Sequence, residues 1–145
     1  MSTPLTETEI KDMAAQWYRK LDVHAPMVEI LPMLADEGLE MKFPEATLHG
    51  HAGFEGWYQR VIRIFFDEVH TLKEVTVTPA NDGARVKVVV RWEASVWNPP
   101  AAKSERIVLD AYQTWVVKRS LSTQKPVVVT YIVDDLVYAE GSARL

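Results

Sequence analysis

Residues Arg85–Arg119 read RVKVVVRWEASVWNPPAAKSERIVLDAYQTWVVKR, and this stretch decides the fold. Two long apolar runs, 86–97 and 107–118, flank the break NPPAAKSE. Apolar side chains recur at every second position, which is the period of a β-strand that buries one face. That face of the first run comprises Val86, Val88, Val90, Trp92, Ala94 and Val96, and Gln113 is the one polar residue on the matching face of the second run. The stretch therefore predicts two paired strands with a single amide on their inner face.

Length and composition predict one globular domain over residues 1–145. The chain is 48% hydrophobic and 25% charged, which is enough apolar material for a real core. A formal net charge of -4, without a cluster of Lys or Arg, is unfavourable for binding nucleic acid or an anionic membrane. No apolar run approaches the roughly 18 residues of a membrane span, and no signal-like start is visible, so a cytoplasmic protein is predicted. The absence of cysteine excludes disulfides and thiolate chemistry.

The remaining elements follow from caps, breakers and periodicity. Thr6 and Glu9 form a capping-box pattern that opens a helix over 7–22. A second helix begins at Pro26, and Pro32 is expected either to kink it or to split it into two short turns. The other predicted elements are a strand over 39–43, a loop over 45–51, a helix over 54–66 expected to be the most buried, and strands over 72–78 and 127–137. Because the helices precede most of the strands, the order predicts an α+β fold in which a curved, mostly antiparallel sheet wraps around three helices.

Three motifs and the paired long strands together resemble a known superfamily. The motifs are AxxWYRKLD at 14–22, LADEGLEMKFP at 34–44 and GFEGWY at 53–58. In this order they resemble the nuclear-transport-factor-2-like superfamily of cystatin-like fold, which includes ketosteroid isomerase, scytalone dehydratase, limonene epoxide hydrolase and SnoaL-type polyketide cyclases. The resemblance covers nearly the whole chain and implies a conical cavity. It also implies either an isomerase, dehydratase or cyclase that needs no cofactor, or a module without catalysis that binds a ligand or a protein partner.

The catalytic residues of those enzymes are only partly matched. Alignment with ketosteroid isomerase places Trp17 at its tyrosine, Phe43 at its aspartate base and Gln113 at its second aspartate, so both carboxylates are replaced. The Arg-x-Asp pair of limonene epoxide hydrolase has a counterpart only in Arg106 and Asp110, which are four positions apart. The inward histidines and tyrosines of scytalone dehydratase correspond in type alone to His49, His51, His70, Tyr18 and Tyr58.

Large rings from several elements are expected to converge on the concave side of the sheet. Such rings either fill a core or line a cavity for a small hydrophobic or aromatic molecule. A ligand cavity of that kind usually spans roughly 300–1,000 Å³. The candidate substrate-binding residues are Trp17, Phe43, Trp57, Tyr58, Phe65, Trp92 and Trp115, with Gln113 as a polar wall.

The candidates for chemistry in this cavity are Asp134, His70, Gln113 and Tyr58. Gln113 needs a partner, because an unpaired buried amide costs roughly 1–3 kcal/mol; it either bonds Tyr58 or backbone, or polarises a substrate carbonyl. Asp134 and Asp135 alternate on the last strand, so one of them is expected to face inward as a base or to pair with an arginine. His70 follows FFDEV and is expected to act as a base, to cap the helix over 54–66 or to lie in a loop.

Metal and cofactor chemistry is not expected. His49 and His51 near Glu45 are too few for a metal site, and no glycine-rich phosphate loop is present. If the protein is an enzyme, Asp134 or His70 would transfer a proton while Gln113 or the Tyr58 hydroxyl donates a hydrogen bond.

The second face of the long strands predicts a homodimer. Val89, Trp97, Tyr112 and Val116 lie there among charged residues, and this face is too apolar for full solvation. A sheet-to-sheet contact about a twofold axis would cover it, with Arg91 and Glu93 available to pair across the contact.

Overall fold

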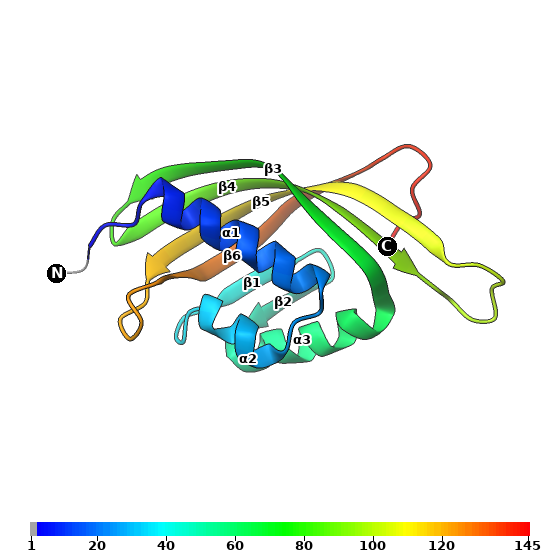
Figure 1. The fold of residues 1–145 in the computed structure, drawn as a ribbon, viewed down its shortest axis with the longest axis horizontal. Helices are drawn as coiled ribbons and strands as arrows, with labels where there is room; N and C mark the ends of the chain where they lie inside the picture. Colours follow the sequence, from blue (N-terminus) through cyan, green and yellow to red (C-terminus); the bar gives the residue numbers. More distant parts are fainter. Residues whose placement is uncertain (1–2) are drawn as a thin grey trace.

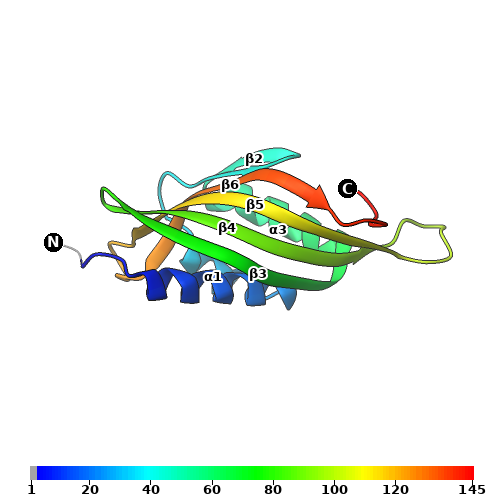
Figure 2. The same ribbon diagram turned by 90° about the horizontal axis from the view of Figure 1, so that it is seen from above.

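The computed structural model describes residues 3–145, and its main feature is an open six-stranded sheet in the order β2-β1-β6-β5-β4-β3. The strands are β1 (Glu40–Phe43), β2 (Ala46–His49), β3 (Phe65–Ala80), β4 (Gly83–Val96), β5 (Glu105–Arg119) and β6 (Pro126–Tyr138). Neighbouring strands are antiparallel, except that β1 runs parallel to β6. The sheet curves around the helices α1 (Glu7–Asp22) and α3 (Gly50–Ile64), as Figures 1 and 2 show. The predicted α+β fold with a curved, mostly antiparallel sheet is confirmed.

Helix α1 is the most buried helix. The Thr6 side chain accepts a hydrogen bond from the Glu9 backbone N–H at 3.1 Å, and the Glu9 carboxylate accepts one from the Thr6 backbone N–H, so the predicted capping box is present. Five residues of α1 are buried against the concave face, whereas α3 buries only Phe54 and Tyr58. The prediction that the helix over 54–66 is the most buried was wrong, because α1 crosses the concave face of the sheet while one side of α3 borders a cavity.

Two element boundaries differ from the sequence prediction. The expected loop over 45–51 contains β2, which pairs with β1 as a short hairpin, and α3 begins directly after it at Gly50. Helix α3 ends at Ile64, so Phe65 and Phe66 open strand β3. Paired aromatic residues fit either a helical stripe or a strand, which is why periodicity alone extended the helix too far. Of the kink or split expected at Pro32, the structure has the split, with α2 (Met27–Ile30) followed by the short 3-10 helix η1 (Leu31–Met33).

Strands β3 and β4 form a hairpin, and its turn requires a glycine. Asp82 has a φ of 65°, and Gly83 starts β4 opposite Lys118 of β5. A Cβ built on Gly83 would lie 2.2 Å from the backbone oxygen of Val117, so only glycine lets the turn approach β5 this closely.

An ion pair fastens the start of α1 to the end of β5. The Arg119 guanidinium donates to both Glu9 carboxylate oxygens, at 2.8 and 3.0 Å. Hydrogen bonds from Arg119, and next from the Thr6 backbone, lower the pKa of Glu9 from 4.5 to about 2. Because the folded-state pKa lies below the unfolded value, the stabilisation is present above pH 4.5 and is lost as the pH falls toward 2.

We expect Glu9→Gln to lower the free energy of unfolding at pH 7 but to have little effect near pH 2. The Glu9 side chain is 36% exposed, so solvent screening limits the loss at pH 7 to about 1 kcal/mol. Urea unfolding at the two pH values measures the difference. Glu7→Gln is the matched control, because Glu7 forms only an exposed pair with Lys11. An equal effect of Glu9→Gln at both pH values would contradict this account.

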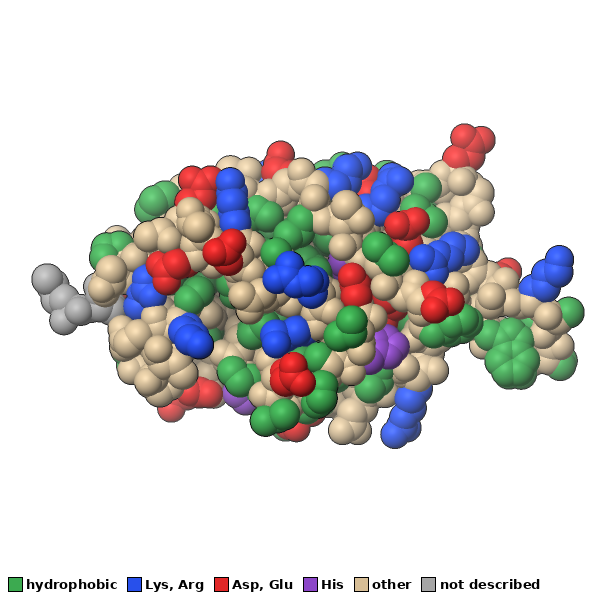
Figure 3. Space-filling model, in the orientation of Figure 1, with side chains coloured by type: hydrophobic (Ala, Val, Ile, Leu, Met, Phe, Trp, Pro, Cys, Tyr) green, Lys and Arg blue, Asp and Glu red, His purple; other side chains and the backbone are tan. Residues whose placement is uncertain are grey.

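The surface facing the viewer in Figure 3 carries basic and acidic side chains interspersed over α1 and the neighbouring strands. Among residues 3–145, no helix has the length and apolar character needed to cross a bilayer.

Candidate functional site

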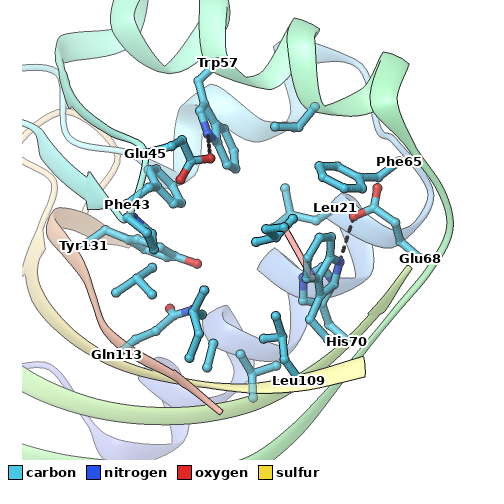
Figure 4. A pocket seen from close by; sticks show the side chains of 18 of the residues that line it. Leu21, Phe43, Glu45, Trp57, Phe65, Glu68, His70, Leu109, Gln113 and Tyr131 are labelled. Carbon is cyan, nitrogen blue, oxygen red and sulfur yellow. Dashed lines mark hydrogen bonds between the residues drawn. The ribbon is translucent and has the colours of Figure 1, made fainter. Parts of the chain in front are cut away.

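A pocket lies between α3, β1 and the concave face of the sheet (Figure 4). Its free volume is about 130 Å³, which is smaller than the roughly 300–1,000 Å³ expected from the sequence. Its lining residues include Leu21, Phe43, Glu45, Trp57, Tyr58, Val61, Ile62, Phe65, Glu68, His70, Val90, Trp92, Leu109, Ala111, Gln113, Tyr131, Val133 and Leu136. A cavity of about 150 Å³ suffices for benzene, so this space matches one ring.

Five of the predicted aromatic residues line this pocket. Phe43 and Trp57 stack with ring centroids 4.2 Å apart on one side, and Phe65 meets Trp92 edge-on at 5.0 Å on the other. Tyr58 is the fifth, and its hydroxyl donates to the Ala25 carbonyl at 2.7 Å. These rings form the apolar walls, and whether they bind a substrate stays a prediction.

Trp17 and Trp115 do not line the pocket, contrary to the sequence prediction. Their exposed fractions are 1% and 0%, and both rings pack against Tyr131, at 5.9 and 5.2 Å between centroids. Tyr131 itself reaches the pocket and separates the two indoles from it. The strand parity correctly placed Trp115 on the inner face, but it could not distinguish the base of the core from the cavity wall. These two rings fill space that would otherwise enlarge the pocket.

The Gln113 amide is buried and held in one orientation. Its Oε1 accepts hydrogen bonds from the Tyr18 hydroxyl and from Trp115 Nε1, both at 2.9 Å. The expected partner Tyr58 is therefore replaced by Tyr18. Because two donors occupy Oε1, the amide cannot flip, and its Nε2 hydrogens are the groups available to the pocket, into which the side chain points in Figure 4.

The buried tyrosines beside Gln113 remain protonated at neutral pH. Burial raises the pKa of Tyr18 and of Tyr131, whose hydroxyl oxygens lie 3.3 Å apart. Burial, and next the nearby Glu68 carboxylate, raise the pKa of Tyr58 to about 12. None of the three can serve as a base at neutral pH. Tyr58 donates its single hydroxyl hydrogen to the Ala25 carbonyl, so it is not the hydrogen-bond donor to a ligand that the sequence suggested.

His70 is the ionisable residue whose environment best suits a base. It lies on β3, not at the end of a helix or in a loop, and its ring stacks on Tyr18 at 4.7 Å. Asp22, the last residue of α1, contacts both its backbone N–H, at 3.1 Å, and its Nδ1, at 2.6 Å. With the Nδ1 hydrogen directed to Asp22, a neutral imidazole carries its free lone pair on Nε2. His70 lines the pocket.

A second imidazole-carboxylate pair lies on the same side of the pocket. Glu68 accepts hydrogen bonds from His24 Nε2 and, at 3.0 Å, from Trp92 Nε1 (Figure 4 shows the latter). Only 9% of the Glu68 side chain is exposed, although a glutamate normally remains in solvent. The pocket wall therefore contains a buried, hydrogen-bonded carboxylate.

The other sequence candidates lie outside the pocket. Asp134 and Asp135 are both exposed, and Asp134 accepts a hydrogen bond from Thr114 at 2.7 Å, so the prediction of an inward aspartate was wrong. The cause is a β-bulge: Tyr112 pairs with Asp135 and Gln113 with Val133, which leaves Asp134 as an extra residue.

The remaining family-based candidates are also elsewhere. Arg106 donates to Ser95 at 3.0 Å, and Asp110 pairs with Arg91. His49 is exposed, and His51 Nε2 lies 3.4 Å from the Leu34 carbonyl oxygen. In the described part of the chain, no three His, Asp or Glu side chains gather as a metal site would require.

The sequence analysis did not predict three residues of the site, Asp22, Glu68 and Tyr131. Of these, only Asp22 has a recognisable feature in the sequence. A carboxylate in the last turn of a helix is disfavoured by the helix dipole, so Asp22 at the end of AxxWYRKLD needed another partner. Glu68 reaches the pocket only because of a bulge. Tyr131 lies in an apolar run, and nothing in the pattern distinguishes it from its neighbours. Neither could be found from periodicity.

Comparison with known proteins identifies the fold through structure alone. No protein-family model and no curated protein sequence matches this chain. A type 2 hexachlorocyclohexane dehydrochlorinase, LinA, superimposes with a TM-score of 0.74 at 12% identity, over 95% of this chain and 91% of that one. A Nostoc punctiforme protein of unknown function with a cystatin-like fold gives 0.72 at 14% identity, over 99% and 100%. A protein of the NTF2-like family from Streptomyces avermitilis gives 0.67 at 12% identity, over 86% and 91%.

Each of these likenesses covers at least 86% of this chain and at least 91% of the other protein. The cystatin-like fold that the resemblance implied is therefore confirmed, and it is shared with the structure of a protein from the NTF2-like family.

Proposed function

We propose that the protein is an enzyme that moves a proton on a small hydrophobic ring molecule, in a reaction of the isomerase, dehydratase or cyclase type. The observation that carries this proposal is the 2.6 Å contact between His70 Nδ1 and Asp22 on the wall of an aromatic pocket. A carboxylate that orients one imidazole nitrogen leaves the other as a general base.

In this proposal the first step removes a proton from a carbon next to a carbonyl group. His70 Nε2 takes the proton, and the electron pair of the broken C–H bond moves toward the carbonyl, whose oxygen becomes an enolate oxygen. The Gln113 Nε2 group supplies hydrogen bonds to that oxygen, and because Tyr18 and Trp115 hold the amide, no reorientation is needed during the reaction. Isomerisation, loss of water and ring closure can all begin with this step.

The structural neighbours lend this chemistry limited support. The name of one neighbour denotes loss of hydrogen chloride from a six-membered ring, which is an elimination that also removes a proton from carbon. At 12% identity the likeness carries the fold only, so the proposal depends on the residues of this pocket.

The test is hydrogen-deuterium exchange at carbon. Cyclohexanone and 2-cyclohexen-1-one, each a single ring with one carbonyl, are incubated with the protein in D₂O, and loss of the α-proton signals is followed by ¹H NMR. We expect exchange faster than in buffer alone and faster than with an equal concentration of imidazole. No acceleration with either ketone would contradict the proposal and favour a ligand-binding module without catalysis.

We also propose that two copies associate through the outer face of the sheet. On this face Val89 lies opposite Tyr112, and Tyr112 and Val137 are 41% and 50% exposed. Within residues 3–145 the helices lie on the opposite side of the sheet (Figure 2). Arg91, expected to pair across the contact, forms a 3.0 Å ion pair with Asp110 of its own chain. Trp97 lies past the end of β4, where a hairpin projects from the body (Figure 1).

Light scattering after size exclusion should give twice the mass of one chain at micromolar concentration. A stable contact would bury more than roughly 1,000 Å² in total. Tyr112→Glu places a charge at the centre of this face and should yield a monomer, whereas Val28→Glu, at a residue that is 77% exposed on α2, should leave the mass unchanged. A monomeric unsubstituted protein would refute the dimer.

A further inference from the structure

Strand β3 contains a bulge that turns Glu68 into the pocket. Phe66 pairs with Ser95 and Val69 with Glu93, so two residues of β3, Asp67 and Glu68, lie opposite one residue of β4. Asp67 adopts a φ of 50°, a conformation that side chains other than glycine rarely take. Bulges of this kind redirect a side chain, and without it Glu68 would share the outer face with Phe66.

Arg106 of β5 reaches across β4 and stabilises the bulge. Its Nη1 donates to the Asp67 carbonyl at 2.7 Å and to the buried Ser95 hydroxyl at 3.0 Å. The unusual backbone of Asp67 is therefore maintained by a specific contact. Strained residues of this sort persist where the surrounding structure maintains them, and they concentrate at functional sites.

Two protein donors position the Glu68 carboxylate, but they do not use all of its capacity to accept hydrogen bonds. His24 donates to Oε2 and Trp92 to Oε1, so each oxygen has one protein donor. A carboxylate offers about four acceptor positions in all, and each oxygen therefore keeps capacity for a donor supplied from the pocket. The two protein donors fix where that ligand group must lie.

The pocket wall, as formed by residues 3–145, carries carboxylates but neither lysine nor arginine. Glu68 lies inside and Glu45 at the rim, where it accepts a 3.4 Å hydrogen bond from Trp57 Nε1. Among the described residues that line the pocket, none is a lysine or an arginine. A carboxylate or phosphate on a ligand would therefore meet negative charge with no lysine or arginine among these lining residues to offset it, whereas a hydroxyl or an amine would meet an acceptor.

We propose that Glu68 is a specificity-determining residue, which selects a ring compound carrying a hydrogen-bond donor, a hydroxyl or an amine, and excludes ring compounds that are anionic. This inference rests on the proposed function only in using the same pocket as the ligand site. Binding tests it without turnover, so failure of His70 as a base would leave it standing, and the reverse also holds.

The experiment compares four ligands built on one ring: toluene, benzyl alcohol, benzylamine and benzoate. Two indole N–H signals report the site in ¹H–¹⁵N NMR titrations, because Trp92 Nε1 bonds Glu68 and Trp57 Nε1 bonds Glu45. A hydrogen bond to a charged group raises affinity about tenfold or more. We therefore expect benzylamine or benzyl alcohol to bind at least about tenfold more tightly than toluene, and benzoate most weakly.

Glu68→Gln removes the charge while keeping the shape. We expect it to weaken binding of the donor ligands toward that of toluene and to improve binding of benzoate. Glu74→Gln is the matched control, because this exposed carboxylate lies on the same strand but outside the pocket and should change the order little.

Preference for both donor ligands supports the proposal, and preference for only one narrows the class to alcohols or to amines. Toluene binding as tightly as both donor ligands, or an unchanged order in Glu68→Gln, would overturn it. The order measured on the unsubstituted protein remains decisive even if Glu68→Gln does not fold.

Discussion

His70→Gln should reduce the rate of carbon-bound proton exchange by roughly 10²–10⁴-fold, the usual contribution of a general base. Glutamine can keep a hydrogen bond to Asp22 and fills similar space, but its amide cannot accept a proton near neutral pH. The rate is measured with the ketone showing the fastest exchange, by the loss of its α-proton signal in D₂O. His49→Gln removes an exposed imidazole outside the pocket and should keep the full rate.

Asp22→Asn tests the same pair from the other side. Asparagine presents an amide whose N–H₂ group can donate to His70 Nδ1, which favours the tautomer with its hydrogen on Nε2 and removes the free lone pair from the pocket. We expect a loss of rate similar to that of His70→Gln, with no further loss in the double variant, because the two residues act as one unit. Full activity in either single variant would exclude this pair as the base.

Trp115→Ala should lower the free energy of unfolding by roughly 3–5 kcal/mol, the usual cost of deleting a large buried ring. Trp115 is 0% exposed and stacks on Tyr131 at 5.2 Å, so its removal leaves a cavity beneath the pocket. The variant also removes the Nε1 donor to Gln113. Urea denaturation followed by circular dichroism measures the change.

Trp97→Ala is the matched control for this prediction. Trp97 is 52% exposed and bonds only the Ala101 carbonyl, so its removal should cost about 1 kcal/mol or less. Equal losses in the two variants would show that Trp115 is not a central core residue. Trp115→Phe keeps a ring but has no N–H. It therefore separates the stability that is lost with the packing of the ring from the stability that is lost with the hydrogen bond to Gln113.

Periodicity was sufficient for the framework of this protein. Alternation along the two long strands correctly placed Val86, Val88 and Trp115 on the inner face, with Gln113 as the buried amide between them. The capping box at Thr6 correctly opened the first helix. These features depend on local spacing, which is visible in one chain.

The chemistry of the pocket could not be obtained in this way, because it depends on departures from regular alternation. A bulge in β6 places Asp135 on the outer face beside Asp134, although regular alternation from Val133 would have turned it inward. A bulge in β3 turns Glu68 to the inner face. An extra residue reverses the face of the sheet on which each following side chain lies. Neither bulge contains a glycine that would mark it in the sequence. The partner of His70 is 48 residues away in the chain, so only the folded structure brings Asp22 to it.

The bulge at Asp67 also affects how the protein avoids self-association along its sheet edge. Strand β3 is an outermost strand, and a regular outermost strand of 16 residues would offer a long row of free N–H and C=O groups to another chain. Register breaks around Asp67 and Lys73, together with Pro79 near the end, interrupt that row. Deleting Asp67 would therefore leave Glu68 on the inner face, opposite Ala94, but it would straighten the edge and promote strand-to-strand polymerisation.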